Sequence, residues 1–210
     1  MTASRQAVVF DWNGTVLDDI QMCLHATNKT LKHFGLDGVS IERYREVYHV
    51  PIDHTYRSLG VTEQQLKERG GELVSVWGSE YEKACANLQL REGAVDALSF
   101  LKGSGHKMAV LSNYTVEKII AQAMRFSIQD YFHEILANDC LTSAMKQGKA
   151  ERLEHYVANN NIDGAMIIGD SVEEIEIARS HGFISVGITG GAHTEKKLRT
   201  ANPDFIIHSL

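Results

Sequence analysis

The sequence has few of the features that mark several large classes of protein. It contains only two prolines in 210 residues and no stretch rich in proline, glycine or serine, so nothing predicts a linker or a low-complexity region. No apolar run reaches transmembrane length, and the polar residues 1–5 are too short for a signal peptide. We therefore expect no membrane partner and a cytoplasmic location.

Zinc and nucleic-acid signatures are also missing. The three cysteines have no CxxC spacing, and no two of the ten histidines are four residues apart, so neither residue type predicts a zinc site. Acidic residues outnumber basic ones by 27 to 21, which gives a formal net charge of −6. Because nucleic acids and anionic membranes require a basic surface, we expect neither as a partner.

The first notable stretch joins a short apolar run to an acidic residue. Residues 6–10 predict a buried strand, and the sequence DWNGT follows at residues 11–15. In open parallel α/β sheets, ligands bind beyond the carboxyl ends of the strands, so Asp11 is expected to face a ligand. The alternative is that Asp11 only opens a turn, because Asp, Asn and Gly are common turn residues.

Short apolar runs alternate with helical patterns in the second half of the chain. Strands are predicted at 107–111, 134–137, 165–168, 184–188 and 205–207, and helices at 94–102, 116–124, 149–160 and 172–181. This alternation predicts an α/β fold with a Rossmann-like parallel sheet covered on both faces. Residues 17–91 show helical periodicity without a convincing strand. We expect them to form an α-helical domain inserted into a core of residues 1–16 and 92–210.

Polar residues follow the predicted strands at several points, and parallel strands bring these points to one edge of the sheet. The residues concerned are Asp11, Ser112, Asn113, Lys146, Lys149 and Asp170. Carboxylates from two strands, a backbone carbonyl and water are the hard oxygen ligands that Mg²⁺ prefers. The set therefore predicts phosphoryl transfer to Asp11. Lys149 is the better candidate for a phosphate-site lysine, since a solvated loop charge is the simpler interpretation of Lys146.

These motifs resemble those of the haloacid dehalogenase (HAD) superfamily of hydrolases, in the phosphoglycolate-phosphatase-like subgroup with a helical cap. The family motif Asp-x-Asp-Gly-Thr is matched by residues 11–15, and its strand followed by Ser or Thr by residues 110–113. Its lysine motif is matched by residues 148–149 and its acidic motif by residues 169–174. The resemblance covers nearly the whole chain and implies the HAD fold.

The resemblance also implies a role for each matching residue. Asp11 would be the nucleophile that takes the phosphoryl group from a small phosphorylated metabolite, in a reaction that needs Mg²⁺. The implied catalytic residues are Asp11, Asn13 and Lys149. The implied Mg²⁺ ligands are Asp11, the Asn13 carbonyl, Asp170 and Glu174. The implied phosphate-binding residues are Ser112, Asn113 and Lys149.

Asn13 departs from the family pattern. Phosphatases of this family have a second aspartate there, which protonates the leaving alcohol and then activates water. An amide cannot exchange a proton near neutral pH, and general acid–base catalysis is worth roughly 10²–10⁴-fold. We therefore expect an atypical or slow phosphohydrolase. His25, Asp18 and Asp19 lie close enough to the motif to be candidate substitutes.

Three different functions stay open beside this one. The first alternative is a catalytically impaired phosphate-binding or regulatory module. The second is a metal-free dehalogenase, and the third is a phosphonate hydrolase with a Schiff-base lysine in the cap. The available cap lysines are Lys29, Lys32, Lys67 and Lys83. Basic and aromatic residues between positions 43 and 57 predict either an ordinary helix surface or a lid over an anionic, ring-bearing substrate. The sequence identifies neither the substrate nor the oligomeric state.

Overall fold

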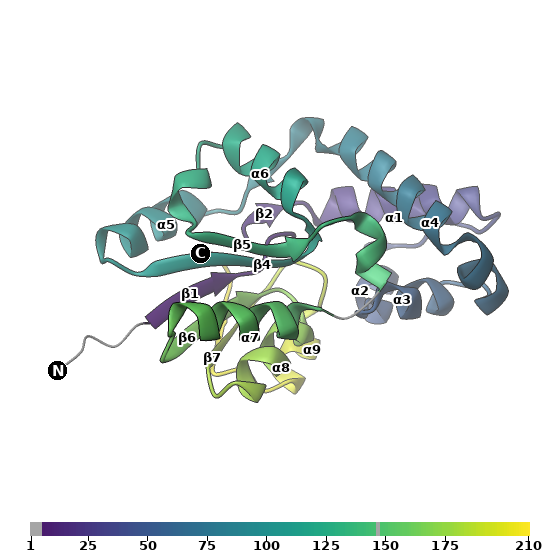
Figure 1. The fold of residues 1–210 in the computed structure, drawn as a ribbon. Helices are drawn as coiled ribbons and strands as arrows, with labels where there is room; N and C mark the ends of the chain where they lie inside the picture. Colours follow the sequence, from purple (N-terminus) through teal and green to yellow (C-terminus); the bar gives the residue numbers. More distant parts are fainter. Residues whose placement is uncertain (1–5, 146–147) are drawn as a thin grey trace.

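Within residues 6–145 and 148–210, which this computed structural model describes, six parallel strands form one sheet in the order β5-β4-β1-β6-β7-β8 (Figure 1). The strands are β1 (Gln6–Phe10), β4 (Lys107–Thr115), β5 (Glu134–Asn138), β6 (Gly164–Gly169), β7 (Ile184–Ile188) and β8 (Phe205–Ile207). Strand β1 lies between β4 and β6. The predicted parallel α/β sheet is confirmed, and the strand that carries Asp11 lies inside it.

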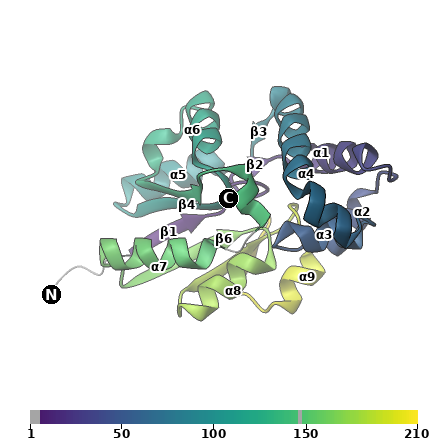
Figure 2. The same ribbon diagram turned by 45° about the vertical axis from the view of Figure 1, so that its right-hand side comes forward.

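Helices cover both faces of the sheet (Figure 2). They are α5 (Ala94–Gly103) and α6 (Val116–Arg125) on one face, and α7 (Lys149–Asn160) and α8 (Val172–Ser180) on the other. Val8 and Phe10 of β1 belong to the hydrophobic cluster that includes α5 and α6 residues, whereas Ala7 and Val9 belong to the cluster of α7 and α8. Because successive strand residues point to opposite faces, a continuous apolar run is what a strand buried on both faces requires.

A helical insert separates β1 from β4 in the chain. Its helices are α1 (Ile20–His33), α2 (Ile41–Val47), α3 (Ile52–Ser58) and α4 (Glu63–Ala84). Thr62 begins α4 with a capping box, and non-helical backbone at Arg69 kinks the helix beside the Gly70-Gly71 pair. Helices α1 and α4 pack side by side and with α2 and α3 form the layer at the right of Figure 1.

Two short strands lie where the insert meets the sheet. They are β2 (Leu17–Asp18) and β3 (Gln89–Leu90), which pair antiparallel. The sequence did not predict them, because two residues are too few to show a period. We propose that this pair forms the connection between insert and core. The boundaries 17–91 of the insert stay a prediction.

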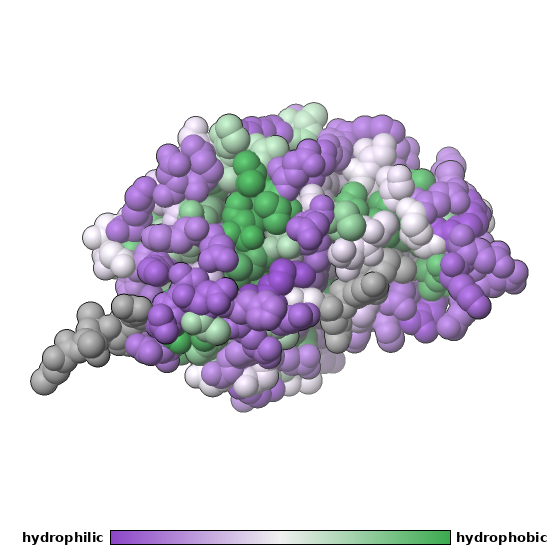
Figure 3. Space-filling model, in the orientation of Figure 1, coloured by the Kyte–Doolittle hydropathy of each residue, from purple (hydrophilic) through white to green (hydrophobic). Residues whose placement is uncertain are grey.

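The remaining part of the chain adds one helix that the sequence patterns did not indicate, α9 (Glu195–Thr200), which begins at a Thr194 cap. Among the described residues, no helix combines the length and the apolarity needed to cross a bilayer. The face drawn in Figure 3 is mostly hydrophilic, with an apolar patch near α6 and β5. Ile120 and Met124 of α6 are among the exposed large apolar side chains.

Candidate active site

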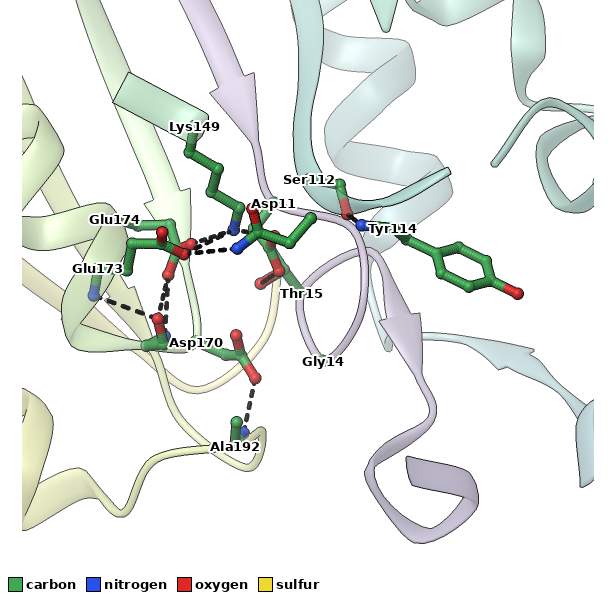
Figure 4. A network of polar contacts seen from close by, with 12 residues as sticks. Asp11, Gly14, Thr15, Ser112, Tyr114, Lys149, Asp170, Glu173, Glu174 and Ala192 are labelled. Carbon is green, nitrogen blue, oxygen red and sulfur yellow. Dashed lines mark hydrogen bonds and ion pairs between the residues drawn. The ribbon is translucent and has the colours of Figure 1, made fainter. Parts of the chain in front are cut away.

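Asp11 lies immediately beyond the end of β1. Its backbone N–H donates to the Ile168 carbonyl at 2.8 Å, which extends the pairing with β6 and fixes the position of the residue. The Asp11 side chain is buried, with Lys149 Nζ 2.7 Å from Oδ1 and Thr15 Oγ1 donating to Oδ2 at 3.3 Å (Figure 4). The strand end therefore holds a carboxylate in a defined orientation instead of an ordinary turn residue.

Lys149 is the first residue of α7 and is buried among carboxylates. Its Nζ contacts Glu174 as well as Asp11, and it lies 3.5 Å from Glu173 Oε2 (Figure 4). Burial alone lowers the pKa of Lys149, but the charges of Asp11, Glu174 and Glu173 outweigh it, and the pKa rises well above its usual value. The neighbouring carboxylates therefore favour the ionised form of Lys149. Lys146, the weaker candidate, lies outside the described residues.

Asp170 follows β6 and packs directly against the DWNGT loop. The Ala192 N–H donates to Asp170 Oδ2 at 2.6 Å. A Cβ atom at Gly14 would lie 2.1 Å from the same oxygen, and Gly14 has φ of +73°, a left-handed conformation that favours glycine. Glycine at this position therefore lets the loop that carries Asp11 and Asn13 approach the second carboxylate.

The cavity at this edge of the sheet has an unbalanced charge. Among the described residues that line its volume of about 70 Å³, five carboxyl groups accompany one ammonium. Burial raises the pKa of Asp11 to about 7, with Lys149 opposing the rise. Burial, followed by the charges of Asp11 and Glu174, raises the pKa of Asp170 well above its usual value. Buried carboxyl groups that cannot all ionise together are suited to a divalent cation.

The donor set fits Mg²⁺ only as an open site. Within the described residues, no group of three His, Cys, Asp or Glu side chains is arranged to hold a metal by itself. Asp11 and Asp170 supply two carboxylates, and the remaining ligands would be the Asn13 carbonyl and water, in keeping with the reluctance of Mg²⁺ to lose its water. The ligand assignments stay predictions.

Glu174 is fully engaged by other groups. One of its oxygens contacts Lys149, and the other accepts from the Ser171 backbone N–H at 3.2 Å and from the Ser171 hydroxyl at 2.7 Å. The Lys149 charge overcomes burial and lowers the pKa of Glu174. Its contacts orient Lys149 and cap α8, so a direct bond to a metal would require these contacts to break.

Ser112 and Asn113 lie near the end of β4, which continues to Thr115 with an irregular register instead of ending at Leu111 as predicted. Both residues line the cavity with Asp11. The Ser112 hydroxyl accepts from the Tyr114 N–H at 3.1 Å, which leaves its own proton for another acceptor. The Asn113 side chain is already occupied, since it donates to Glu173 at 2.9 Å and accepts from Arg152 at 3.3 Å.

Asn13 belongs to a polar network between the DWNGT loop and the helical insert. Its Nδ2 donates to Asp19 Oδ2 at 2.6 Å and to the Tyr81 hydroxyl at 2.8 Å, and Tyr81 donates to the same Asp19 oxygen at 2.5 Å. The other Asp19 oxygen accepts from the Gly14 N–H at 2.7 Å. Burial raises the pKa of Asp19, with these hydrogen bonds opposing the rise. Asn13 is thus one of the donors that satisfy the buried Asp19 carboxyl group.

The three candidate substitutes for the missing acid are not equally placed. Asp18 and His25 are exposed, and neither lines the cavity around Asp11. Asp19 is 1% exposed and lines that cavity. Of the three, Asp19 alone lies at the cavity that contains Asp11.

Comparison with known proteins identifies the family. The family described as haloacid dehalogenase-like hydrolase matches residues 8–188. The chain belongs to this family. A phosphoglycolate phosphatase of Synechococcus elongatus is 25% identical over 206 residues, covering 97% of this chain and 93% of that protein. The probable phosphatase IndB of Dickeya dadantii is 21% identical over 209 residues, covering 98% and 90% respectively.

Solved structures confirm the HAD fold. A haloacid dehalogenase-like hydrolase from Streptococcus pneumoniae superposes with a TM-score of 0.81 at 23% identity, covering 99% of this chain and 95% of that one. A predicted phosphoglycolate phosphatase from Haemophilus somnus gives 0.77 at 20% identity, with coverages of 100% and 96%. The resemblance inferred from the four motifs is therefore confirmed, and this HAD-like hydrolase has relatives that match it over nearly their full length.

Three residues of the site were not assigned from the sequence. Glu173 was interpreted as one of several helix-surface acids, but it bonds Asn113 and lies near Lys149. Arg152 donates to the Ser112 carbonyl at 3.0 Å and braces the end of β4. Tyr81 comes from the insert, 68 positions from its partner Asn13. Arg152 had a detectable signal, because it lies one helical turn after Lys149 and therefore on the same side of α7.

Proposed function

We propose that this HAD-like hydrolase is a Mg²⁺-dependent phosphohydrolase that acts on a small phosphorylated metabolite through phosphoryl transfer to Asp11. The observation that carries the proposal is the buried Asp11 carboxylate beyond the central strand with Lys149 Nζ at 2.7 Å. The names of the relatives, a phosphoglycolate phosphatase and a probable phosphatase, support the same reaction class.

In the proposed reaction, one Asp11 carboxylate oxygen attacks the phosphorus atom while the bond to the leaving-group oxygen breaks. Lys149 offsets the negative charge that collects between Asp11 and the phosphoryl group. The Ser112 hydroxyl can donate to a phosphoryl oxygen. Water then attacks the phosphorus atom of the aspartyl phosphate, which releases phosphate and restores the Asp11 carboxylate.

Asp11, the Asn13 carbonyl and Asp170 would hold Mg²⁺ in this proposal. When bound, the ion draws charge from the phosphoryl oxygens and lets an anionic nucleophile approach an anionic substrate. Glu174 acts through Lys149, because its own oxygens are occupied by Lys149 and Ser171. Its role is to keep the ammonium directed at Asp11.

Proton transfer is the step that sets this chain apart from the family pattern. The Asn13 side chain has no exchangeable proton near neutral pH. The proposed enzyme is therefore slow on leaving groups that need a proton, unless a neighbouring acid such as Asp19 supplies it. This agrees with an atypical phosphohydrolase and leaves the phosphate-binding module as the second candidate.

The phosphonate hydrolase and the metal-free dehalogenase lose support. A phosphonate hydrolase needs a lysine directed into the site, but the four cap lysines are exposed and none lines the Asp11 cavity. A metal-free dehalogenase has no need for the buried Asp170 beside Asp11. The phosphate-binding module keeps its support, because Asn13 removes the usual acid without removing the phosphate site.

The test is phosphate release from a panel of small phosphate monoesters, with and without Mg²⁺. Asp11→Asn keeps the shape of the side chain but removes the nucleophile, so we expect turnover to fall by about 10³-fold or more. Asp18→Asn is the matched control, because Asp18 is an exposed carboxylate of the same segment, and it should leave turnover unchanged. Undiminished turnover in Asp11→Asn contradicts the proposal, whereas phosphonate binding without any turnover favours the binding module.

A further inference from the structure

A second cavity adjoins the Asp11 cavity on the side of the helical insert. It has a volume of about 120 Å³, and Tyr44, Tyr48 and Tyr114 line both cavities. Trp77 and Tyr56 contribute further aromatic surface, and most of the other lining residues are aliphatic. Because the two cavities share walls, a phosphate ester bound at Asp11 would extend its leaving group into the second one.

Two of the aromatic side chains that line this space have their polar ends bonded to protein groups. The Trp77 indole N–H donates to Thr27 Oγ1 at 3.3 Å, and the Tyr114 hydroxyl donates to Glu82 at 3.2 Å. These polar ends are therefore already satisfied. Trp77 also stacks on Tyr81 with ring centroids 4.9 Å apart. Ring contacts and hydrogen bonds thus hold the walls in place before any ligand binds.

Tyrosine hydroxyl groups remain available along the cavity walls. Among the described residues, the Tyr56 hydroxyl is buried without a hydrogen-bond partner. Tyr44 and Tyr48 lie at the junction of the two cavities, and each carries a hydroxyl group. Their rings contact each other, with centroids 5.6 Å apart. Each can donate to an ester or ether oxygen while its ring contacts an apolar group.

The described walls of the second cavity carry no charged side chain. None of its described lining residues is Lys, Arg or His, and none is acidic. The three arginines between positions 43 and 57 are engaged elsewhere: Arg43 with Glu46, Arg57 with Asp53, and Arg45 with the Gly190 and Gly191 carbonyls. The tyrosines of the predicted lid face the site and its arginines do not. A leaving group with a carboxylate would be desolvated here without a partner, close to five carboxyl groups.

We propose that the substrate is a phosphate monoester with an uncharged, largely apolar leaving group of about the size of one ring. An apolar cavity of about 150 Å³ in another protein accommodates benzene, so a volume of about 120 Å³ suits a single ring. The proposal rests on the proposed phosphohydrolase function and specifies its substrate class. It separates this chain from enzymes whose substrate carries a second anionic group, as phosphoglycolate does.

Binding of phosphonates in the presence of Mg²⁺ tests the substrate class without requiring turnover. The probes are benzylphosphonate, methylphosphonate and phosphonoacetate, measured by titration calorimetry. Burying about 100 Å² of ring surface at about 25 cal/mol per Å² predicts that benzylphosphonate binds about 60-fold more tightly than methylphosphonate. Phosphonoacetate should bind no more tightly than methylphosphonate. Equal binding of the benzyl and methyl probes, no binding of the benzyl probe, or a preference for phosphonoacetate overturns the proposal.

A designed change of preference gives the second test. Ile52 is a half-buried aliphatic residue of the cavity wall, and Ile52→Lys places a cation there. The affinity ratio of phosphonoacetate to benzylphosphonate should rise about 10-fold or more. Gln64→Lys is the matched control, because it adds the same charge at an exposed position of the insert, and it should leave the ratio unchanged. The same ratio in both variants contradicts the assignment of this cavity.

The two proposals can fail separately. Benzylphosphonate preference without phosphate release from benzyl phosphate would support the cavity assignment and refute the hydrolase. Phosphate release without benzyl preference would do the opposite. Benzyl phosphate is used instead of an aryl phosphate because its leaving alcohol resembles that of phosphoglycolate in reactivity. A difference between the hydrolysis rates of benzyl phosphate and phosphoglycolate therefore reports a difference in binding.

Discussion

Asn13 and Asp19 form a donor–acceptor pair, and the pair predicts what happens when the usual family aspartate is introduced. In Asn13→Asp, a second carboxyl group takes the place of an amide whose nitrogen is 2.6 Å from Asp19 Oδ2. Two carboxylates about 3 Å apart repel by about 5 kcal/mol at an effective dielectric constant of about 20. One of them will take up a proton instead.

Protonation limits the cost of the substitution. Keeping a proton at pH 7 on a carboxyl group with a pKa near 4 costs about 1.4 kcal/mol per pH unit, or about 4 kcal/mol in total. We therefore expect Asn13→Asp to lower the free energy of unfolding by about 2–4 kcal/mol at pH 7, and by less at pH 5. Asp19→Asn places a second amide beside Asn13, so that one buried N–H donor faces another. We expect this to lower the free energy of unfolding by about 1–3 kcal/mol.

The double variant Asn13→Asp/Asp19→Asn restores the pair with donor and acceptor exchanged. Tyr81 contacts both positions and can donate to either. The double variant should therefore be at least about 2 kcal/mol more stable than the sum of the single changes predicts. Urea unfolding in EDTA measures all four proteins. Additive effects, with the double variant the least stable, would refute the argument. If the missing acid limits turnover, the double variant should also hydrolyse benzyl phosphate about 10–10³-fold faster.

Three further predictions concern the loop, the metal and the interface with the insert. Gly14→Ala should destabilise by about 2–3 kcal/mol and lower kcat/KM about 100-fold, because its Cβ would meet Asp170 Oδ2 at 2.1 Å; normal kinetics would show that the loop need not pack there. Because the pKa of Asp11 is raised to about 7, the folded protein holds an extra proton between about pH 4 and 7, and its metal-free stability falls as pH rises through that range; the raised pKa of Asp170 acts in the same direction. The increase in melting temperature caused by Mg²⁺ should therefore be larger at about pH 8 than at about pH 5.5, and an increase independent of pH argues against these ligands. Burial lowers the pKa of His193 to about 4, and its Nδ1 accepts from the Val172 N–H at 3.0 Å. Up to about 3 kcal/mol of folding stability is therefore lost as pH falls from about 6.5 to 4. His193→Gln should remove this component from the pH profile of urea unfolding.

Much of the fold could be predicted because its signals are local. The apolar run of β1 and the strands that follow it are buried on both faces, which produces short continuous hydrophobic segments that are visible in one sequence. Parallel pairing then brings Asp11 and Asp170 to one edge of the sheet, since both follow neighbouring strands β1 and β6. Lys149 could be predicted from a local signal as well, because it is the first residue of a clear helix.

The contacts of Asn13 could not be predicted, because they depend on how the insert packs on the core. Tyr81 lies four residues after Trp77 in the long helix α4, and nothing in its surroundings in the sequence indicates that its hydroxyl meets Asp19. The apolar character of the second cavity was missed for a related reason. The segment from Arg43 to Arg57 mixes basic and aromatic residues, and only the packing of α2 and α3 decides which of them face the site.

Phosphorylation of Asp11 during turnover is the step on which the proposed function depends. The most direct measurement is acid quenching of the enzyme with Mg²⁺ and benzyl phosphate, followed by tandem mass spectrometry of the peptide that contains β1. We expect one phosphoryl group on Asp11, absent from Asp11→Asn and still present in Asp18→Asn. Phosphate release with no modified Asp11, or with the phosphoryl group on another residue, would contradict it.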